Sequence, residues 1–382
     1  MVIIPLNVFA IKYPNINSDY AIVYDLTDDN IIYSLRADEE ISIASLTKIA
    51  TTITAIKTID NLDEEVIITN KILDTVDPVL SKAGLKSGDK VTYTDLLYAS
   101  MIPSGADATN SIAILSSGSI ANFVQKMNDL AKEIGLNNTH FVNVTGLDEE
   151  GHYSSANDVL KLLKYSLENQ TFRKVFTTKK YTLSNGLSVK STLDKYNAKL
   201  GLNLSKIIGS KTGFTYGAGY CIASLVEVDN HEMIIINLNA PYESGISYHL
   251  IDNVNLSNFI EDNYDDFILI NKNAKIKSLN VSLSNIKTYN IKANEDVKRY
   301  LPTDYDKSLF EAIYDGKDKL TFLDKKGDKI GVITYKYDGK TILTEDEIID
   351  TDIKISLVEI IKNYFYIPLI LIIVPIIFRK HR

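Results

Sequence analysis

Ser45 and Lys48 are the residues whose types and spacing most clearly allow chemistry. They stand three positions apart at the start of an apolar stretch that predicts a helix, so the lysine amine can reach the serine hydroxyl on one helix face. Serine is a weak nucleophile until a base takes its proton, and a lysine in a largely apolar pocket beside another cation can be neutral enough to do so. The backbone N–H of Ser45 is also available for a developing oxyanion. The pair therefore predicts covalent catalysis by a serine.

This spacing is not rare, because it recurs at Ser87 with Lys90 and at Ser284 with Lys287. Ser87 precedes a glycine in a predicted turn, and Ser284 lies in a β-rich region. Neither position offers the helical geometry that brings the two groups together. Both serines are interpreted as surface loop residues.

Two further segments carry groups that suit a peptide substrate. Lys211-Thr212-Gly213 begins a strand-like run, whose edge can present the lysine and the hydroxyl to a carboxylate while the glycine permits close approach. The alternative is a solvated Lys-Thr turn. Ser104, after Pro103, could stand between the two lysines and relay a proton to a leaving amine, or it could simply cap a helix.

Composition narrows the possible functions. The chain has 382 residues, which favours two folded units, and a net charge of −8, which argues against nucleic-acid binding. A single cysteine, Cys221, excludes an internal disulfide and a cysteine-based zinc site, and its apolar surroundings favour a buried structural thiol. The five histidines lack metal-ligand spacing. No metal or cofactor is expected.

The elements that must position these groups suggest one antiparallel sheet flanked by helices. Residues 19–36 predict a hairpin, residues 44–59 a helix, and residues 94–134 a largely helical region that begins with a Thr94 cap and stops at Gly135. Asn185-Gly186 predicts a tight turn. Residues 211–225 and 232–239 predict a hairpin around Asp229-Asn230.

The last third of the chain differs in pattern. Residues 266–350 alternate short apolar segments with turn residues, which predicts a small all-β, sandwich-like spacer domain without a chemical motif. Residues 357–378 are long and apolar enough to cross a membrane, and the basic tail 379–382 favours the cytoplasmic side. Residues 1–17 predict a signal-peptide remnant and lead-in, with the mature chain beginning near Ile11. A single-pass membrane protein with an extracellular catalytic domain, residues 18–262, is expected.

The order of the three motifs, Ser-x-x-Lys at 45, Ser-Gly-x at 104 and Lys-Thr-Gly at 211, resembles the penicillin-binding protein and serine β-lactamase superfamily. The runs at residues 139–147, 152–158 and 211–221 are more closely similar to the low-molecular-mass D-alanyl-D-alanine carboxypeptidases of peptidase family S11. The resemblance covers residues 18–262 and implies a β-lactamase/transpeptidase-like α/β (α+β) fold. The β-rich segment and the C-terminal anchor also fit that family.

The resemblance also implies roles for individual residues. Ser45 would be acylated by the penultimate D-alanine of a peptidoglycan stem peptide, with Lys48 as proton acceptor. Ser104 would pass the proton to the departing D-alanine. Lys211, Thr212 and Gly213 would bind the substrate, and the N–H groups of Ser45 and Phe214 would form the oxyanion hole. β-Lactams would acylate the same serine.

Two departures from the family pattern leave alternatives open. The family usually has asparagine where this chain has Ala106, for which Asp107 could partly substitute, and no arginine occurs between Arg173 and Arg299 to grip the substrate carboxylate. Ala106 leaves a catalytically impaired wall-binding homologue as one alternative. A serine β-lactamase is the other, because Glu133 begins a Glu-x-x-Leu-Asn run like that of enzymes which activate a deacylating water.

Overall fold

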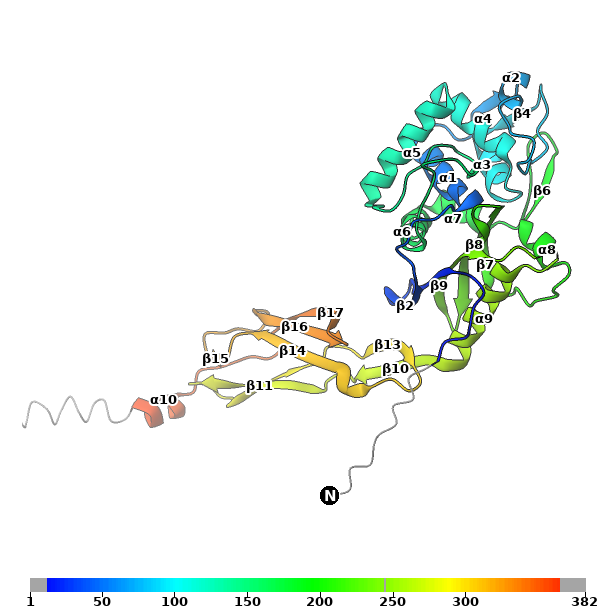
Figure 1. Ribbon diagram of the computed structural model, residues 1–382. Coiled ribbons are helices and arrows are strands. Elements are labelled where there is room, and N and C mark those ends of the chain that lie inside the picture. Colours follow the sequence, from blue (N-terminus) through cyan, green and yellow to red (C-terminus); the bar gives the residue numbers. More distant parts are fainter. Residues whose placement is uncertain (1–11, 244, 365–382) are drawn as a thin grey trace, which may run out of the picture. The chain divides into compact units, whose positions relative to one another are not determined.

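The computed structural model describes residues 12–243 and 245–364, which form two compact units with a boundary between Asn263 and Tyr264 (Figure 1). The first unit is mixed α/β and the second is all-β, as the sequence predicted. The predicted domain ranges were 18–262 and 266–350. Each unit is described separately below.

The first unit is built on a five-stranded antiparallel sheet with strand order β2-β1-β9-β8-β7. The strands are β1 (Tyr20–Asp25), β2 (Asn30–Leu35), β7 (Ile207–Thr215), β8 (Gly219–Val228) and β9 (His231–Ala240). Residues 233–236 of the central strand β9 are fully buried, which explains their unbroken apolar sequence. Strand β7 is at the edge, so one side of its backbone is not paired within the sheet.

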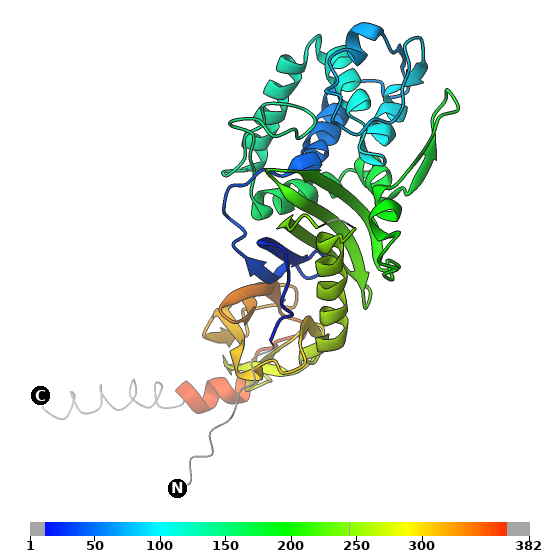
Figure 2. The ribbon, with the colours of Figure 1, turned by 45° about the vertical axis from the view of Figure 1, so that its right-hand side comes forward.

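Helices cover both faces of this sheet (Figure 2). Helix α9 (Tyr248–Asn263) packs on β8 and β9, while α6 (Ala156–Leu167) packs on β1 and β9 and α7 (Gln170–Thr177) packs on β7. Ile234 and Ile236 join the large core on the α6 side. Alternate sheet residues thus serve the two faces, as the strand period of two requires.

Helix α1 (Thr47–Thr58) runs through the middle of the helical part and packs against α3, α4, α5, α6 and α7. The predicted helical region 94–134 is divided into α3 (Tyr93–Met101), α4 (Ala106–Ser117) and α5 (Ile120–Ile134). Thr92, not Thr94, caps α3, because Thr92 and Asp95 form a reciprocal capping box. The predicted stop at Gly135 is confirmed, since this glycine ends α5 in a left-handed conformation.

Two turns predicted from the sequence are confirmed. Asp229 and Asn230 both have positive φ between β8 and β9, and Gly186 has φ of 84° between β5 (Lys180–Thr182) and β6 (Ser188–Lys190). Residues 211–225, however, are not one strand, because β7 and β8 are separated by a turn at residues 216–218. Smaller elements of this unit are β3 (Glu65–Ile67), α2 (Asn70–Leu73), β4 (Lys90–Thr92) and α8 (Thr192–Asn197).

The second unit contains eight strands in the part that the structure describes. They are β10 (Tyr264–Ile270), β11 (Lys275–Ser282), β12 (Thr288–Lys292), β13 (Val297–Pro302), β14 (Phe310–Gly316), β15 (Lys319–Thr321), β16 (Lys329–Tyr337) and β17 (Lys340–Ile348). Its core is centred on Leu279, Ile291, Ile333 and Tyr335, all with 0% exposure. Ser284 is buried here and bonded to the carbonyl of Ile286, so its interpretation as a surface loop residue was wrong.

Both ends of the chain fall partly outside the described residues. Of the predicted anchor 357–378, only α10 (Leu357–Tyr364) is described, and the tail 379–382 lies beyond it. Most of the predicted signal remnant, residues 1–11, also lies outside. Within the described ranges, no helix combines the length and apolar character that crossing a bilayer requires.

Candidate active site

Ser45 lies on the short 3-10 turn η1 (Ala44–Leu46), directly before α1, and Lys48 follows in the first turn of that helix. The Lys48 Nζ is 3.0 Å from the Ser45 Oγ and donates a hydrogen bond of 2.6 Å to the carbonyl of Thr145. Lys48 is only 1% exposed, and burial lowers its pKa to about 7, although the charge of Asp107 partly opposes this. A large share of Lys48 is therefore uncharged at neutral pH, as a proton acceptor must be.

Lys211 and Ser104 form a second buried pair. The Lys211 Nζ, on β7, donates to the Ser104 Oγ at 2.9 Å and to the carbonyl of Thr212 at 2.6 Å. Burial, and then the charge of Lys48, lower the pKa of Lys211 well below its usual range. Ser104 has φ of 64° in the break between α3 and α4, and Gly105 is the N-cap residue of α4. The alternative reading of Ser104 as a helix cap was wrong.

Three contacts hold the turn that carries Ser45. Ala44 has φ of 46°, a left-handed conformation that a non-glycine residue adopts at some cost. The Thr47 Oγ1 donates to the Ala44 carbonyl at 2.9 Å and lies 2.8 Å from the Nε2 of His152. Gly146 packs against the same carbonyl so closely that a Cβ there would lie 1.8 Å from it. The surroundings thus fix η1 in place.

The tautomer of His152 follows from its partners. The Val142 N–H donates to its Nδ1 at 3.2 Å, so the ring proton is on Nε2 and is donated to Thr47. Burial, followed by the nearby His140, lowers the pKa of His152 to about 4. The ring is therefore neutral at physiological pH and serves to position the turn.

Strand β7 runs beside η1. A Cβ on Gly213 would lie 2.7 Å from the Ser45 nitrogen, so only glycine lets the strand approach the nucleophile this closely. The resulting cleft lies at the edge of the sheet. It is lined by Ser45, Val79, Leu80, Ser81, Ser104, Thr192, Lys195, Tyr196, Thr212, Gly213 and Phe214. The structure therefore brings together all the site residues predicted from sequence, with Lys48 bonded to Ser45 and Lys211 bonded to Ser104.

Six cleft residues were not predicted from the sequence: Val79, Leu80, Ser81, Thr192, Lys195 and Tyr196. The Thr192 and Thr212 hydroxyls lie 2.6 Å apart, and Lys195 supplies an exposed cation on the same wall. No motif marks these positions, and the one available signal was polar residues at the start of a short helix before β7.

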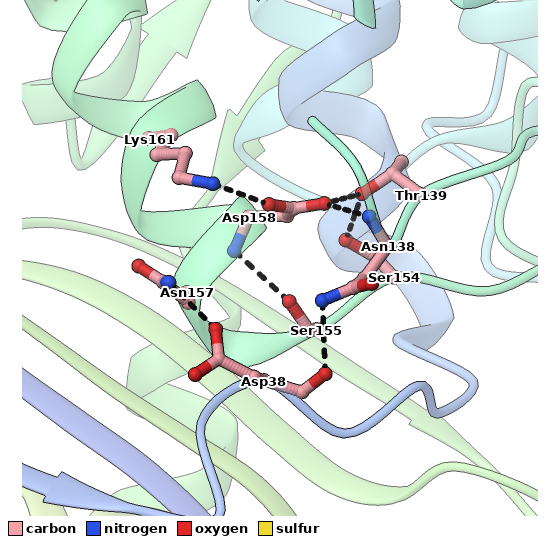
Figure 3. A network of polar contacts seen from close by, with 8 residues as sticks. All are labelled: Asp38, Asn138, Thr139, Ser154, Ser155, Asn157, Asp158 and Lys161. Carbon is pink, nitrogen blue, oxygen red and sulfur yellow. Dashed lines mark hydrogen bonds and ion pairs between the residues drawn. The ribbon is translucent and has the colours of Figure 1, made fainter. Parts of the chain in front are cut away.

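The segment leading to η1 is anchored by a polar network (Figure 3). The Asp38 carboxylate accepts a hydrogen bond from Asn157 at 2.7 Å, and its carbonyl accepts one from Asn138 at 3.0 Å. The Asp158 carboxylate in turn accepts from the Asn138 N–H at 2.6 Å and from the Thr139 hydroxyl at 2.9 Å. The runs at residues 139–147 and 152–158 thus have a structural role in placing the nucleophile.

Asp107 does not take the place of the missing asparagine side chain. Its carboxylate accepts hydrogen bonds from the N–H groups of Ala83, Gly84 and Leu85, at 2.8, 2.9 and 3.0 Å. It therefore fixes the loop that carries Ser81 into the cleft. Its influence on Lys48 is electrostatic, because its charge favours the protonated amine.

Glu133 lies at the end of α5, where it forms an ion pair of 2.8 Å with Lys57, and it does not line the catalytic cleft. It is thus not placed to activate a water at Ser45. Cys221 is fully buried, and burial raises its pKa to about 12, so it is a structural thiol.

One group in the described part of the chain could hold a metal ion. Ligand atoms of Asp25, Asp28 and His231 lie within 4.8 Å of one another. One Asp25 oxygen already accepts from the Thr27 and Asp28 N–H groups, and the other lies 2.9 Å from the His231 Nδ1. These contacts explain the cluster as a link between two hairpin turns, β1–β2 and β8–β9.

Two family models and several known proteins match this chain. The family model described as D-alanyl-D-alanine carboxypeptidase (peptidase S11) matches residues 7–242, and that of the penicillin-binding protein 5 C-terminal domain matches residues 264–355. The D-alanyl-D-alanine carboxypeptidase DacF of Bacillus subtilis is 27% identical over 328 residues, covering 84% of this chain and 82% of that protein. DacA of Haemophilus influenzae is 29% identical over 353 residues, covering 87% and 84%.

Solved structures of related proteins share the fold of this chain. Penicillin-binding protein 5 of Haemophilus influenzae shares the fold, with a TM-score of 0.66 and 24% identity over 90% of this chain and all of that one. The Streptomyces K15 DD-transpeptidase has a TM-score of 0.58 and 29% identity, over 65% of this chain and 98% of that one. This chain therefore belongs to the D-alanyl-D-alanine carboxypeptidases of peptidase family S11 and is a hydrolase of that type.

Proposed function

We propose that this protein removes the terminal D-alanine from peptidoglycan stem peptides ending in D-Ala-D-Ala, through an acyl-enzyme on Ser45. The contact between Lys48 and Ser45, 3.0 Å long and buried, is the observation that carries this proposal. It supplies a nucleophile and a base whose pKa is near the working pH.

The first half-reaction forms an ester. Neutral Lys48 takes the Ser45 proton while Oγ attacks the carbonyl carbon of the penultimate D-alanine. The N–H groups of Ser45 and Phe214 stabilise the oxyanion. The peptide C–N bond then breaks, and the proton reaches the departing amine through Ser104, which Lys211 holds in place.

The second half-reaction regenerates the free enzyme. A water attacks the ester carbonyl and gives its proton to Lys48. The ester C–O bond then breaks, Lys48 returns the proton to the Ser45 Oγ, and the shortened peptide is released as an acid. β-Lactams present a carbonyl to the same nucleophile and acylate it. Thr212, Thr192 and Lys195 line the cleft and would bind the substrate's terminal carboxylate.

The alternatives have less support. A β-lactamase needs a water-activating base near Ser45, and Glu133 is engaged with Lys57 elsewhere. A catalytically impaired homologue rests on Ala106 alone, whereas both lysine–serine pairs are in place.

We also propose an extracellular location with a C-terminal membrane anchor at residues 357–378. Its support is the sequence, which is apolar from residue 364 to 378 and basic directly after. Protease treatment of intact cells should release the catalytic unit; a protein that stays in the soluble cell fraction would contradict the anchor.

The decisive experiment pairs mass spectrometry after penicillin treatment with an assay of D-alanine release from a diacyl-D-Ala-D-Ala peptide. We expect one long-lived adduct on Ser45, absent in Ser45→Ala and formed much more slowly in Lys48→Ala. Rapid penicillin turnover would favour the β-lactamase. Undiminished acylation in Lys48→Ala would remove the lysine as base.

A further inference from the structure

An exposed aromatic surface adjoins the catalytic cleft where β7 ends. Tyr216 and Tyr242 are 86% and 56% exposed, and their ring centroids are 5.9 Å apart in an edge-to-face arrangement. Phe214, which lines the cleft, lies 5.6 Å from Tyr216 and 5.0 Å from Tyr242. We call Tyr216 and Tyr242 the tyrosine platform.

Folding does not explain this exposure. Among the described residues, Tyr216 is the most exposed large hydrophobic side chain, and the next, Val79 at 80%, lines the same cleft. Neither platform tyrosine belongs to the buried core. Exposed aromatic side chains that continue a binding cleft mark a surface for contact with a ligand.

The direction of the substrate is fixed by two anchor points on β7, which rest on the proposed function. The terminal carboxylate is at Thr212 and the scissile carbonyl is at the Phe214 N–H, so the upstream residues of the stem run toward Tyr216. Extended peptide advances about 3.3 Å per residue. Tyr216 is then about 7 Å beyond Phe214, whereas the three stem residues before the scissile D-alanine span about 10 Å. The amino end of the stem, where the glycan sugar is attached, therefore reaches the platform.

The chemistry of the platform suits a sugar. A pyranose has an apolar C–H face that packs on an aromatic ring and a rim of hydroxyls that hydrogen-bond to a phenol, and tyrosine offers both surfaces. Within the described residues, neither phenolic hydroxyl of the platform has a hydrogen-bond partner. The neighbouring Glu243 is exposed, which disfavours an anionic ligand or an anionic membrane surface.

We infer that Tyr216 and Tyr242 form a subsite that stacks on the N-acetylated hexosamine carrying the stem peptide. The enzyme thereby prefers stems still joined to their sugar over free stem peptides.

The test compares D-alanine release from a pentapeptide stem and from the same stem joined to N-acetylmuramic acid. The wild-type enzyme should show a kcat/KM about tenfold higher for the sugar-bearing substrate, in line with aromatic contacts in other systems. In the double variant Tyr216→Ala/Tyr242→Ala this ratio should fall to about one, while Tyr216→Phe/Tyr242→Phe should keep most of it. Ile31→Ala, an exposed apolar residue on β2 at the opposite edge of the sheet, is the matched control and should keep the full ratio. A penicillin adduct on Ser45 shows that each variant is folded.

Equal kcat/KM for both substrates in the wild-type enzyme, or a ratio unchanged in the double alanine variant, would overturn the subsite. If the wild-type enzyme released D-alanine from neither substrate, the result would instead count against the proposed function. In that case, the subsite is tested without catalysis. Binding of the two substrates is measured to Ser45→Ala, with and without the platform substitutions. A sugar-dependent gain in affinity that needs the tyrosines supports the subsite, and its absence refutes it.

Discussion

Lys211 donates a hydrogen bond to Ser104 across 2.9 Å, and this contact links the edge strand of the sheet to the break between two helices. The two residues are 107 positions apart in the chain. Their meeting supplies a hydroxyl, held by a buried amine, in the cleft that Ser45 also lines. This arrangement leads to the first prediction.

Ser104→Ala should lower kcat for D-alanine release by about 100-fold or more, because general acid–base groups contribute at least that much. Ser104→Gly is the matched variant: it loses the same hydroxyl but adopts φ of 64° without strain. It should therefore be equally slow yet melt at a higher temperature than Ser104→Ala. Wild-type turnover in either variant would exclude Ser104 from proton transfer.

Acylation by penicillin should depend on the protonation of Lys48. Below its pKa of about 7 the amine carries a proton and cannot accept one, so the rate should rise with pH and level off above that value. Asp107→Asn removes a charge that raises this pKa, and so should move the midpoint to lower pH. Lys48→Arg, which keeps a permanent charge, should not be acylated. A rate that does not vary between about pH 5 and 9 would contradict the base role.

Thr47→Val should weaken the turn that carries the nucleophile. It removes the bond to the Ala44 carbonyl and leaves the buried Nε2–H of His152 without its partner, which costs about 1–3 kcal/mol of unfolding free energy. Acylation should slow by about tenfold or more, as expected for a misplaced reacting group. Thr47→Ser keeps the hydroxyl and should behave like the wild type. Urea unfolding and acylation kinetics measure the two effects, and loss of stability without slower acylation would leave Thr47 a purely structural residue.

Lys195→Ala should raise KM for the D-Ala-D-Ala peptide with little change in kcat, because an exposed cation contributes binding more than transition-state stabilisation. The expected increase is about two- to fivefold, the range of exposed ion pairs. Lys199→Ala removes the same charge from the same segment outside the cleft lining and should leave KM unchanged. Equal effects of the two variants would point to general electrostatics.

The sequence predicted the parts of the site that depend on local geometry. Ser45 and Lys48 meet because residues three apart share a helix face. The turn at Asp229-Asn230 and the stop at Gly135 follow from residues that tolerate positive φ. These relationships involve neighbours in the chain, so residue type and spacing were enough to find them.

Contacts that depend on tertiary packing could not be predicted from the sequence. Thr192 contacts Thr212, twenty positions along the chain, and no sequence pattern indicates this contact. The Thr145 carbonyl that bonds to Lys48 is a backbone group, which any residue type would provide. Likewise, position 146 requires glycine because the Ala44 carbonyl lies so close to it, and this distance cannot be predicted from the sequence. The division of 94–134 into three helices was also not predicted, although turn-forming residues stand at both breaks, Pro103-Ser104-Gly105 and Ser117-Gly118-Ser119.

Burial of Lys48 and Lys211 affects the stability of the whole catalytic unit. Removing an amine from water is costly unless its charge is compensated, and these two are close enough for one to depress the pKa of the other. An unbranched apolar side chain such as methionine would occupy either position without that cost. The enzyme is therefore less stable than its fold permits, and a lineage freed from selection for hydrolysis would gain thermal resistance by losing its lysines first.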